Sequence, residues 1–249
     1  MIHLANECDF NRNITDESEL RICSLKRAYG LAVPFIQFFA DDDGAIASVM
    51  DRVCTLYCAS LPSDEWCEFL QMNGNIKVIH TNADIAAFLA RRWGISHEKG
   101  CVLCRESLLS EKPLHEYNIH DVSLRDIYGV LSKTFCEFPS FDSWYVDASH
   151  RHRHGCCHIV TEKQNDQPIS VAMTIAETED MALIGCVATL PEHRGRGAAS
   201  RCIHQLMGFL KQRRILISPS DAHSEGLYRK LGFLPYGTWG EVSLHETGG

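Results

Sequence analysis

The sequence of 249 residues has no long hydrophobic run, and no stretch approaches the roughly 20 apolar residues that a membrane-spanning helix needs. Its first ten residues, MIHLANECDF, contain neither the basic nor the apolar segment of a signal peptide, so we expect a cytoplasmic protein with no membrane partner. Positive charge is also scarce, because 24 Lys and Arg residues against 32 Asp and Glu residues give a formal net charge of −8. Since nonspecific nucleic-acid binding needs a broadly positive surface, we expect no nucleic acid as a partner.

Cysteine, in contrast, is abundant, with twelve residues. Disulfide frameworks belong mainly to small secreted domains, whereas this chain is long and shows no export signal. Cys54 and Cys58 lie in the apolar segment VCTLYC, where a reduced cysteine packs as a small hydrophobic side chain. We therefore predict that most cysteines are free thiols. The length is sufficient for one large domain or two ordinary ones.

The C-terminal half has the clearer secondary-structure pattern. Ser123 is a predicted N-cap, with Asp126 three residues later and apolar residues at helical spacing after it. The segment MALIGCVATL is apolar throughout, which is typical of a central strand. We predict the order helix, helix, three strands, helix, strand, helix, strand, over residues 121–135, 141–152, 157–162, 169–177, 181–190, 199–210, 215–220, 222–233 and 239–244.

The N-terminal half repeats part of this order. CASLPS at 58–63 is similar to VATLPE at 187–192, and each segment joins a strand to a helix, so we interpret the two halves as a pseudo-repeat. The boundary is expected in the polar, proline-containing segment 109–117, which gives domains of residues 1–110 and 111–249. We predict three strands, helix, strand, helix and strand over residues 34–40, 45–50, 53–58, 63–74, 76–80, 83–94 and 100–106.

The loop PEHRGRGAAS at 191–200 joins the predicted central strand to an amphipathic helix. Such a helix start leaves its first N–H groups without partners, and glycines at 195 and 197 allow a ligand to approach the backbone closely. The helix dipole and the charges of Arg194 and Arg196 favour an anion, so the loop predicts a pyrophosphate site. It lacks both the Gly-Lys-Ser/Thr ending of a nucleotide P-loop and the spacing of a dinucleotide fold.

This loop resembles the pyrophosphate loop of the GNAT superfamily of acyl-CoA-dependent N-acyltransferases, whose signature Arg/Gln-x-x-Gly-x-Gly/Ala is met by Arg194, Gly197 and Ala199. EGLYRKLGF at 225–233 is similar to the fourth helix and following turn of the family, and the resemblance covers roughly residues 115–249. It implies an α/β (α+β) GNAT fold, a mixed central sheet flanked by helices, with a second, smaller GNAT-like N-terminal domain. That N-terminal domain would be degenerate, because it has Asp64 and Glu65 where the loop residues should be, and carboxylates repel a pyrophosphate.

The resemblance also implies the site. In the family, free backbone groups of a splayed fourth strand pair with the pantetheine arm of acetyl-CoA, and the loop amides bind the pyrophosphate. Tyr228 matches the tyrosine that protonates the departing thiolate after direct attack of an amine on the thioester, with the oxyanion held by a strand N–H. The implied cofactor-binding residues are Val187, Ala188, Thr189, Arg194, Gly195, Arg196, Gly197, Ala198, Ala199 and Asp221.

Two positions depart from the family pattern. Asp221 stands where the family often has an asparagine that contacts the cofactor, and a carboxylate there is unfavourable beside phosphates. The general base, in many members a glutamate on the fourth strand, has its nearest equivalent at Met181. Glu177 and Glu179 lie just upstream, in the predicted turn before that strand, where both could also be solvated. We keep Glu179 as the candidate base beside Tyr228.

Other patterns carry weaker alternatives. The segment SHRHRHGCCH at 149–158 could bind a metal, line the acceptor cleft, or only place positive charge at a helix C-terminus. Its spacing matches no familiar zinc pattern, and we predict no metal. The CVLC segment at 101–104 lies in a predicted strand that points its cysteines to opposite faces, and DDDG at 41–44 predicts a hairpin turn.

The sequence thus predicts an acyltransferase that moves an acetyl group from acetyl-CoA to a primary amine of a small molecule or amino-acid-like acceptor. A peptide or protein acceptor is the nearest variant. A non-catalytic CoA-binding sensor or scaffold and a metal-sensing module are the alternatives. A homodimer is compatible with the sequence, which does not specify the oligomeric state.

Overall fold

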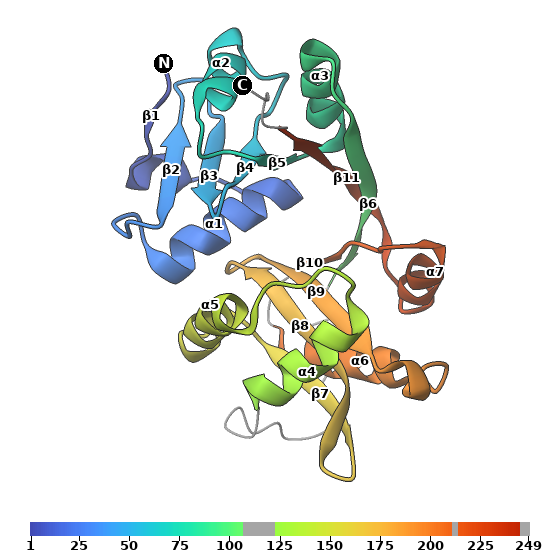
Figure 1. Ribbon diagram of the computed structural model, residues 1–249. Helices are drawn as coiled ribbons and strands as arrows, with labels where there is room; N and C mark the ends of the chain where they lie inside the picture. Colours follow the sequence, from blue (N-terminus) through green and yellow to red (C-terminus); the bar gives the residue numbers. More distant parts are fainter. Residues whose placement is uncertain (107–122, 211–213, 245–249) are drawn as a thin grey trace. The chain divides into compact units, whose positions relative to one another are not determined.

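The computed structural model describes residues 1–106, 123–210 and 214–244, which form two compact units (Figure 1). One unit comprises Met1–Val102 with Pro235–Gly249, and the other comprises Leu103–Leu234. The expected boundary segment 109–117 lies outside the described residues. Among the described residues, no helix combines the length and the apolar composition needed to cross a membrane.

The first unit has helices on both faces of its sheet. Its strands are β1 (His3–Leu4), β2 (Ile36–Ala40), β3 (Ile46–Met50), β4 (Val53–Tyr57), β5 (Val78–Thr81), β6 (His97–Glu106) and β11 (Leu234–Ser243). The helices are η1 (Glu7–Phe10), α1 (Glu17–Tyr29), α2 (Asp64–Met72) and α3 (Ala83–Trp93). Because side chains alternate along β3, Ile46 packs in the core that α1 covers, and Ala47 packs in the core beneath α2 and α3.

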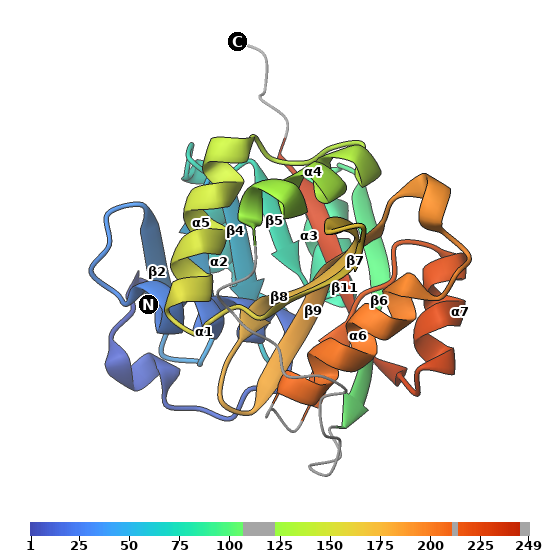
Figure 2. The same cartoon turned by 90° about the horizontal axis from the view of Figure 1, so that it is seen from below.

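Over residues 124–230 the second unit has the predicted sequence of elements, whereas the last predicted strand, at 239–244, falls in β11 of the first unit. Its strands β7 (Ile159–Gln164), β8 (Gln167–Glu177), β9 (Met181–Thr189) and β10 (Arg214–Ile217) lie beside one another in the order β10-β9-β8-β7. The helices α4 (Leu124–Thr134) and α5 (Phe141–Arg153) share a core with Val171 and Met173 of β8, whereas α6 (Ala198–Phe209) contacts Ser170 on the other face. The short η3 (Pro191–His193) and α7 (Ala222–Lys230) complete the unit, which Figure 2 shows from below.

The two units do not correspond to two consecutive halves of the sequence. Each unit includes in its sheet a strand from the other half of the sequence. β11, the last strand of the chain, pairs antiparallel with β5 of the first unit through Gly240–Ser243. In the second unit, residues 103–106 at the end of β6 pair antiparallel with β10. The last strand of each half of the sequence thus completes the sheet of the other unit.

Helix α1 was not predicted from the sequence, although its signals are present. Asp16 is its N-cap, accepting from the N–H of Ser18, and Gly30 ends it with a φ of +73°. Its buried face includes the charged residues Glu17 and Glu19, so the helix lacks a simple apolar stripe. A search for hydrophobic periodicity therefore passes over it.

Candidate active site

The edge of β9 becomes free halfway along the strand. β10 runs parallel to β9 and pairs with Met181–Ile184, but it ends at Ile217, opposite Ile184. β9 continues to Thr189. The two strands therefore separate beyond Ile184, as the resemblance implied.

A bulge in β9 marks this point. Cys186 has a φ of +48°, and the pairing with β8 shifts register between Met173–Gly185 and Val171–Ala188. Leu190 donates to the carbonyl of Ile169, so in an antiparallel ladder the N–H groups of residues 188 and 190 face β8. Those of Val187 and Thr189 then point to the side that β10 has left.

A groove of about 540 Å³ occupies this side. It lies between the end of β9, the loop into α6 and the start of α7, and the end of α4 closes it. Its lining consists of Thr134, Phe135, Val187, Ala188, Thr189, His193, Arg194, Gly195, Gly197, Ala198, Ala199, Ser200, Ser220, Asp221, His223, Ser224, Leu227 and Tyr228. The structure thus brings together most of the residues that the sequence predicted, although they come from separate segments.

The start of α6 differs from every other α-helix start in the described part of the chain. The other six helices have an N-cap side chain that accepts from a backbone N–H of the first turn, namely Asp16, Ser63, Asn82, Ser123, Ser140 and Asp221. The N-cap of α6 is Gly197, with a φ of 77° and no capping side chain. Gly195 also has a positive φ, of 75°. Since the first N–H groups of α6 have no capping partner and border the groove, they can bind an anion there.

The arginines of the loop have different positions. Arg194 lines the groove, and its Nε donates to the carbonyl of Thr189 at 3.1 Å, which holds the guanidinium beside β9. Arg196 is exposed and does not line the groove, although it was a predicted cofactor-binding residue. Arg201 pairs with Glu162, and its Nη1 donates to the carbonyl of Arg196. Arg194 is therefore the arginine of this loop that contributes charge to the groove.

Tyr228 lies in the groove with only 6% of its surface exposed. Burial and, secondarily, the charge of Asp221 raise the pKa of its hydroxyl to about 12. The phenol is therefore protonated at neutral pH and can donate a proton. Its carbonyl accepts from the N–H groups of Leu231 and Phe233, which fixes the end of α7.

Asp221 has a structural role that was not predicted from the sequence. Its Oδ1 accepts from the N–H of Ser224 at 2.7 Å, and the hydroxyl of Ser224 completes a capping box at the start of α7. The hydrogen bond from the Ser224 backbone lowers the pKa of the carboxyl, so Asp221 is ionised at neutral pH. The carboxylate thus caps the start of α7, whereas the start of α6, which also borders the groove, has no capping side chain.

The two upstream glutamates lie away from this groove. Glu179 is exposed in the turn between β8 and β9 and does not line the groove. The groove borders the far end of β9, and Met181 lies six residue steps, about 20 Å of extended strand, before Val187, the first residue of β9 in the lining. Glu177, in contrast with the expected solvated turn, is fully buried at the end of β8. Its carboxylate accepts from the Thr174 hydroxyl and from the backbone N–H and Nδ1 of His158.

The histidine-rich segment forms local contacts. His150 and His154 stack at 4.2 Å between ring centroids, and Nδ1 of His152 bonds the carbonyl of Cys157 at 3.1 Å. Within residues 1–106, 123–210 and 214–244, no three His, Cys, Asp or Glu side chains converge as a metal site would require. All twelve cysteines, Cys101 and Cys104 included, are free thiols. This segment therefore packs and caps the end of α5.

In the first unit, the segment between β4 and α2 corresponds to the loop between β9 and α6, but the helix that follows it starts differently. The helix after β4 is α2, whose start is capped by the Ser63 hydroxyl, which accepts from the N–H of Trp66. Asp64 and Glu65 occupy its first turn, and Asp64 pairs with Arg92 at 2.7 Å. A helix start that is already capped and carries carboxylates disfavours a phosphate.

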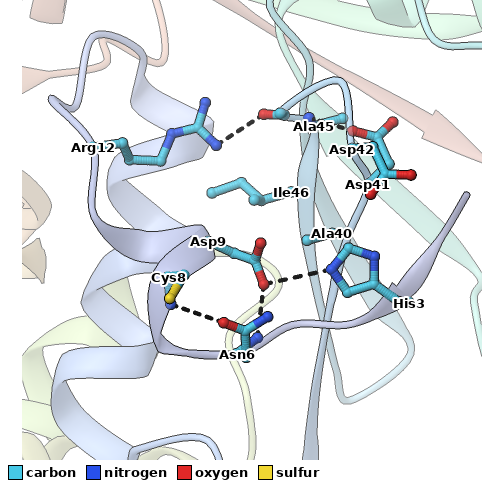
Figure 3. A pocket seen from close by; sticks show the side chains of 11 residues that line it. His3, Asn6, Cys8, Asp9, Arg12, Ala40, Asp41, Asp42, Ala45 and Ile46 are labelled. Carbon is cyan, nitrogen blue, oxygen red and sulfur yellow. Dashed lines mark hydrogen bonds and ion pairs between the residues drawn. The ribbon is translucent and has the colours of Figure 1, made fainter.

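A separate cavity of about 520 Å³ in the first unit lies between β1, η1 and the turn joining β2 to β3 (Figure 3). Its polar side chains form hydrogen bonds and ion pairs with other groups of the protein. Asp9 accepts from the N–H of Asn6 and lies 3.6 Å from Nε2 of His3, and Arg12 donates to the carbonyl of Gly44. Asp41 accepts from the indole N–H of Trp66. These contacts give the cavity wall its structure and leave the groove beside β9 as the candidate active site.

A strand that separates from its parallel neighbour beside an uncapped helix start leaves free backbone N–H groups on both elements at one groove. Residues 124–233 match the family model described as Acetyltransferase (GNAT) family. Residues 124–233 therefore form a domain of the GNAT acetyltransferase type, which supports an acyl-CoA-dependent acyltransferase activity.

Solved structures extend the likeness in fold to nearly the whole chain. A Drosophila protein has a TM-score of 0.66 at 10% identity, covering 99% of each chain. A GCN5-related N-acetyltransferase from Sphaerobacter thermophilus has a TM-score of 0.60 at 15% identity, covering 98% of this chain and 95% of the other. A tandem GNAT protein from the clavulanic acid biosynthesis pathway, solved without acetyl-CoA, has a TM-score of 0.56 at 11% identity, covering 95% and 91%. At these identities the likeness establishes the GNAT fold alone. No curated protein matches the chain in sequence.

Proposed function

We propose that this protein transfers the acetyl group of acetyl-CoA to a primary amine of a small molecule or amino-acid-like acceptor. The observation that carries the proposal is the groove in which the uncapped start of α6 meets the free edge of β9. The residues fit acetyl-CoA in two respects. The helix start offers N–H groups to a diphosphate, and β9 offers backbone groups to an amide-containing arm.

The binding role of each segment follows from its geometry. The N–H groups at the start of α6, from Gly197 to Ala199, face the diphosphate, and Arg194 adds a positive charge beside it. The N–H groups of Val187 and Thr189, which point away from β8, pair with the pantetheine arm. The arm is thereby directed along β9 toward the point where the two strands separate.

Acetyl-CoA supplies an activated acyl group, and the protein supplies a proton. As the bond from the acceptor nitrogen to the acetyl carbon forms and the carbon–sulfur bond breaks, the hydroxyl of Tyr228 donates its proton to the departing sulfur. The amine releases one proton during the reaction, and that proton restores the tyrosine through solvent. Because burial raises the pKa of this hydroxyl to about 12, its proton is present at neutral pH.

We further propose that the first unit is a degenerate GNAT-like domain that binds no acetyl-CoA. Its order of elements from β2 to β6 repeats that from β7 to β11 in type. The capping of α2 by Ser63 and the ion pair of Asp64 support the loss of a phosphate site. The cytoplasmic location and the choice of a small acceptor over a peptide remain predictions from the sequence.

Calorimetric titration of the full chain with acetyl-CoA, followed by a thiol-release screen against a library of amines, tests the proposal. A catalytic protein binds acetyl-CoA and releases CoA with at least one amine. Tyr228→Phe should bind acetyl-CoA with unchanged affinity and lose turnover by about 100-fold, because the proton donor is gone while the ring remains. If the wild-type chain binds acetyl-CoA but no amine gives turnover above the rate of Tyr228→Phe, the chain is a CoA-binding sensor or scaffold.

A further inference from the structure

The groove contains little fixed positive charge for a ligand as anionic as coenzyme A. Among its described lining residues, the guanidinium of Arg194 is opposed by the ionised carboxylate of Asp221. The described lining from β9 and α4 is uncharged, and Tyr228 is neutral. Nearby, Glu225 of α7 lies outside the lining and pairs with Arg229 at 2.7 Å. The fixed side-chain charges of the groove therefore cancel, and the helix dipole of α6 is left as the permanent positive contribution.

Two histidines line the same groove from different elements. His193 ends η3, directly before Arg194, and His223 lies in the first turn of α7. Nδ1 of His193 is covered by the protein and has no hydrogen-bond partner there, so Nε2 is the ring nitrogen left to meet a ligand in the groove. His223 is exposed and lines the groove from the start of α7. Neither histidine belongs to the sequence signature that identified the loop.

We infer that His193 and His223 are phosphate-binding residues of the acetyl-CoA groove and that their protonation supplies the positive charge that its fixed residues lack. The inference rests on the proposed function, because it assigns these residues to the coenzyme A site. Histidine is the side chain whose charge changes between pH 5 and 8. Binding of a phosphate favours the protonated ring, so ligand binding takes up protons, and affinity decreases as the pH rises.

Calorimetric titrations of the full chain with CoA at pH 6.0, 7.0 and 8.0 test the inference. The affinity of the wild-type chain should fall by about fivefold or more between pH 6 and pH 8, because a protonated imidazole binds a phosphate more tightly than a neutral one. Repeating the titration at pH 7.0 in buffers of different ionisation enthalpy measures proton uptake directly. His193→Gln and His223→Gln should each reduce this uptake, and the double variant should abolish it.

His204→Gln is the matched control, because His204 is exposed on α6 but does not line the groove. It should reproduce the wild-type proton uptake. Dephospho-CoA, which lacks the 3′-phosphate, separates the two phosphate groups: uptake that persists with this ligand assigns the histidines to the diphosphate, and uptake that disappears assigns them to the 3′-phosphate.

The outcomes distinguish the inference from the function on which it rests. A chain that binds no CoA at any pH overturns the proposed function itself. A chain that binds CoA with the same proton uptake in the wild type and in the double variant overturns only the role of the histidines. Circular dichroism of each variant verifies that the fold is retained.

Discussion

Replacing Gly197 with alanine tests the link between the backbone at the start of α6 and acetyl-CoA binding. Gly197 has a φ of 77°, a conformation that costs an L-residue about 1–2 kcal/mol. A Cβ at this position would lie 3.0 Å from Nη1 of Arg201, which can move because it ends a flexible side chain. Backbone strain therefore dominates, and we expect Gly197→Ala to lower the melting temperature by about 2–8 °C.

The strain has a second consequence, for binding. If the alanine relaxes toward a negative φ, the N–H groups at the helix start turn away from the groove. Losing one hydrogen bond to a charged group costs about 1.5–3 kcal/mol, so the Kd for acetyl-CoA should rise by about 10- to 100-fold. Isothermal titration calorimetry measures this change on the full chain.

Gly155→Ala is the matched control for this experiment. Gly155 follows α5 with a φ of +65°, and a Cβ there meets nothing within 4 Å. It lies in the same unit and does not line the groove. We expect a similar loss in melting temperature with no change in acetyl-CoA affinity. If Gly197→Ala binds acetyl-CoA as tightly as Gly155→Ala does, the reasoning about the helix start is wrong.

Three further predictions follow from individual side chains. Asp221→Asn keeps a good N-cap for α7 but removes a negative charge from the groove, so the Kd for acetyl-CoA should fall by about twofold to fivefold in calorimetry; weaker binding would contradict this. Glu179→Gln alters an exposed turn outside the groove, and kcat should stay within about twofold of wild type, whereas a tenfold loss would restore Glu179 as the base. In the first unit, burial lowers the pKa of His80, but hydrogen bonds to Glu17 and Glu241 outweigh this and raise it overall. The stabilisation from His80 is therefore complete below its unfolded pKa of about 6.5 and is lost as the pH rises through the higher folded pKa. Melting temperatures should fall over that range, and His80→Gln should flatten the dependence; an unchanged slope in the variant would refute the role of His80.

The features that the sequence predicted correctly are those encoded by neighbouring residues. Ser123 caps α4, Ser63 caps α2, and the apolar segment of β9 is a central strand of the second unit. The glycines of the loop have the positive φ values that favour glycine. Each of these signals depends on a few adjacent positions, so local physical rules are sufficient to find it.

The features that were missed depend on residues far apart in the chain. The exchange of β6 and β11 between the sheets depends on pairing with β10 and β5, which no local pattern encodes. Glu177 was placed with Glu179 in a turn because spacing alone does not show that His158 supplies its hydrogen bonds.

The sequence signature also identified the residues of the groove incompletely. Arg196 is in the loop signature region, but its side chain does not line the groove, and His193 and His223 line it without matching the signature. His193 directly precedes Arg194 within the loop at 191–200, and this position was the signal that could have drawn attention to it.

The number of acetyl-CoA molecules bound by one chain tests the central claim most directly. The uncapped start of α6 and the free edge of β9 form one site, whereas the start of α2 is capped by Ser63 and carries Asp64. Calorimetric titration of the full chain should therefore give one acetyl-CoA per chain, with binding weakened by Gly197→Ala. Binding of two molecules, or of none, would contradict the account.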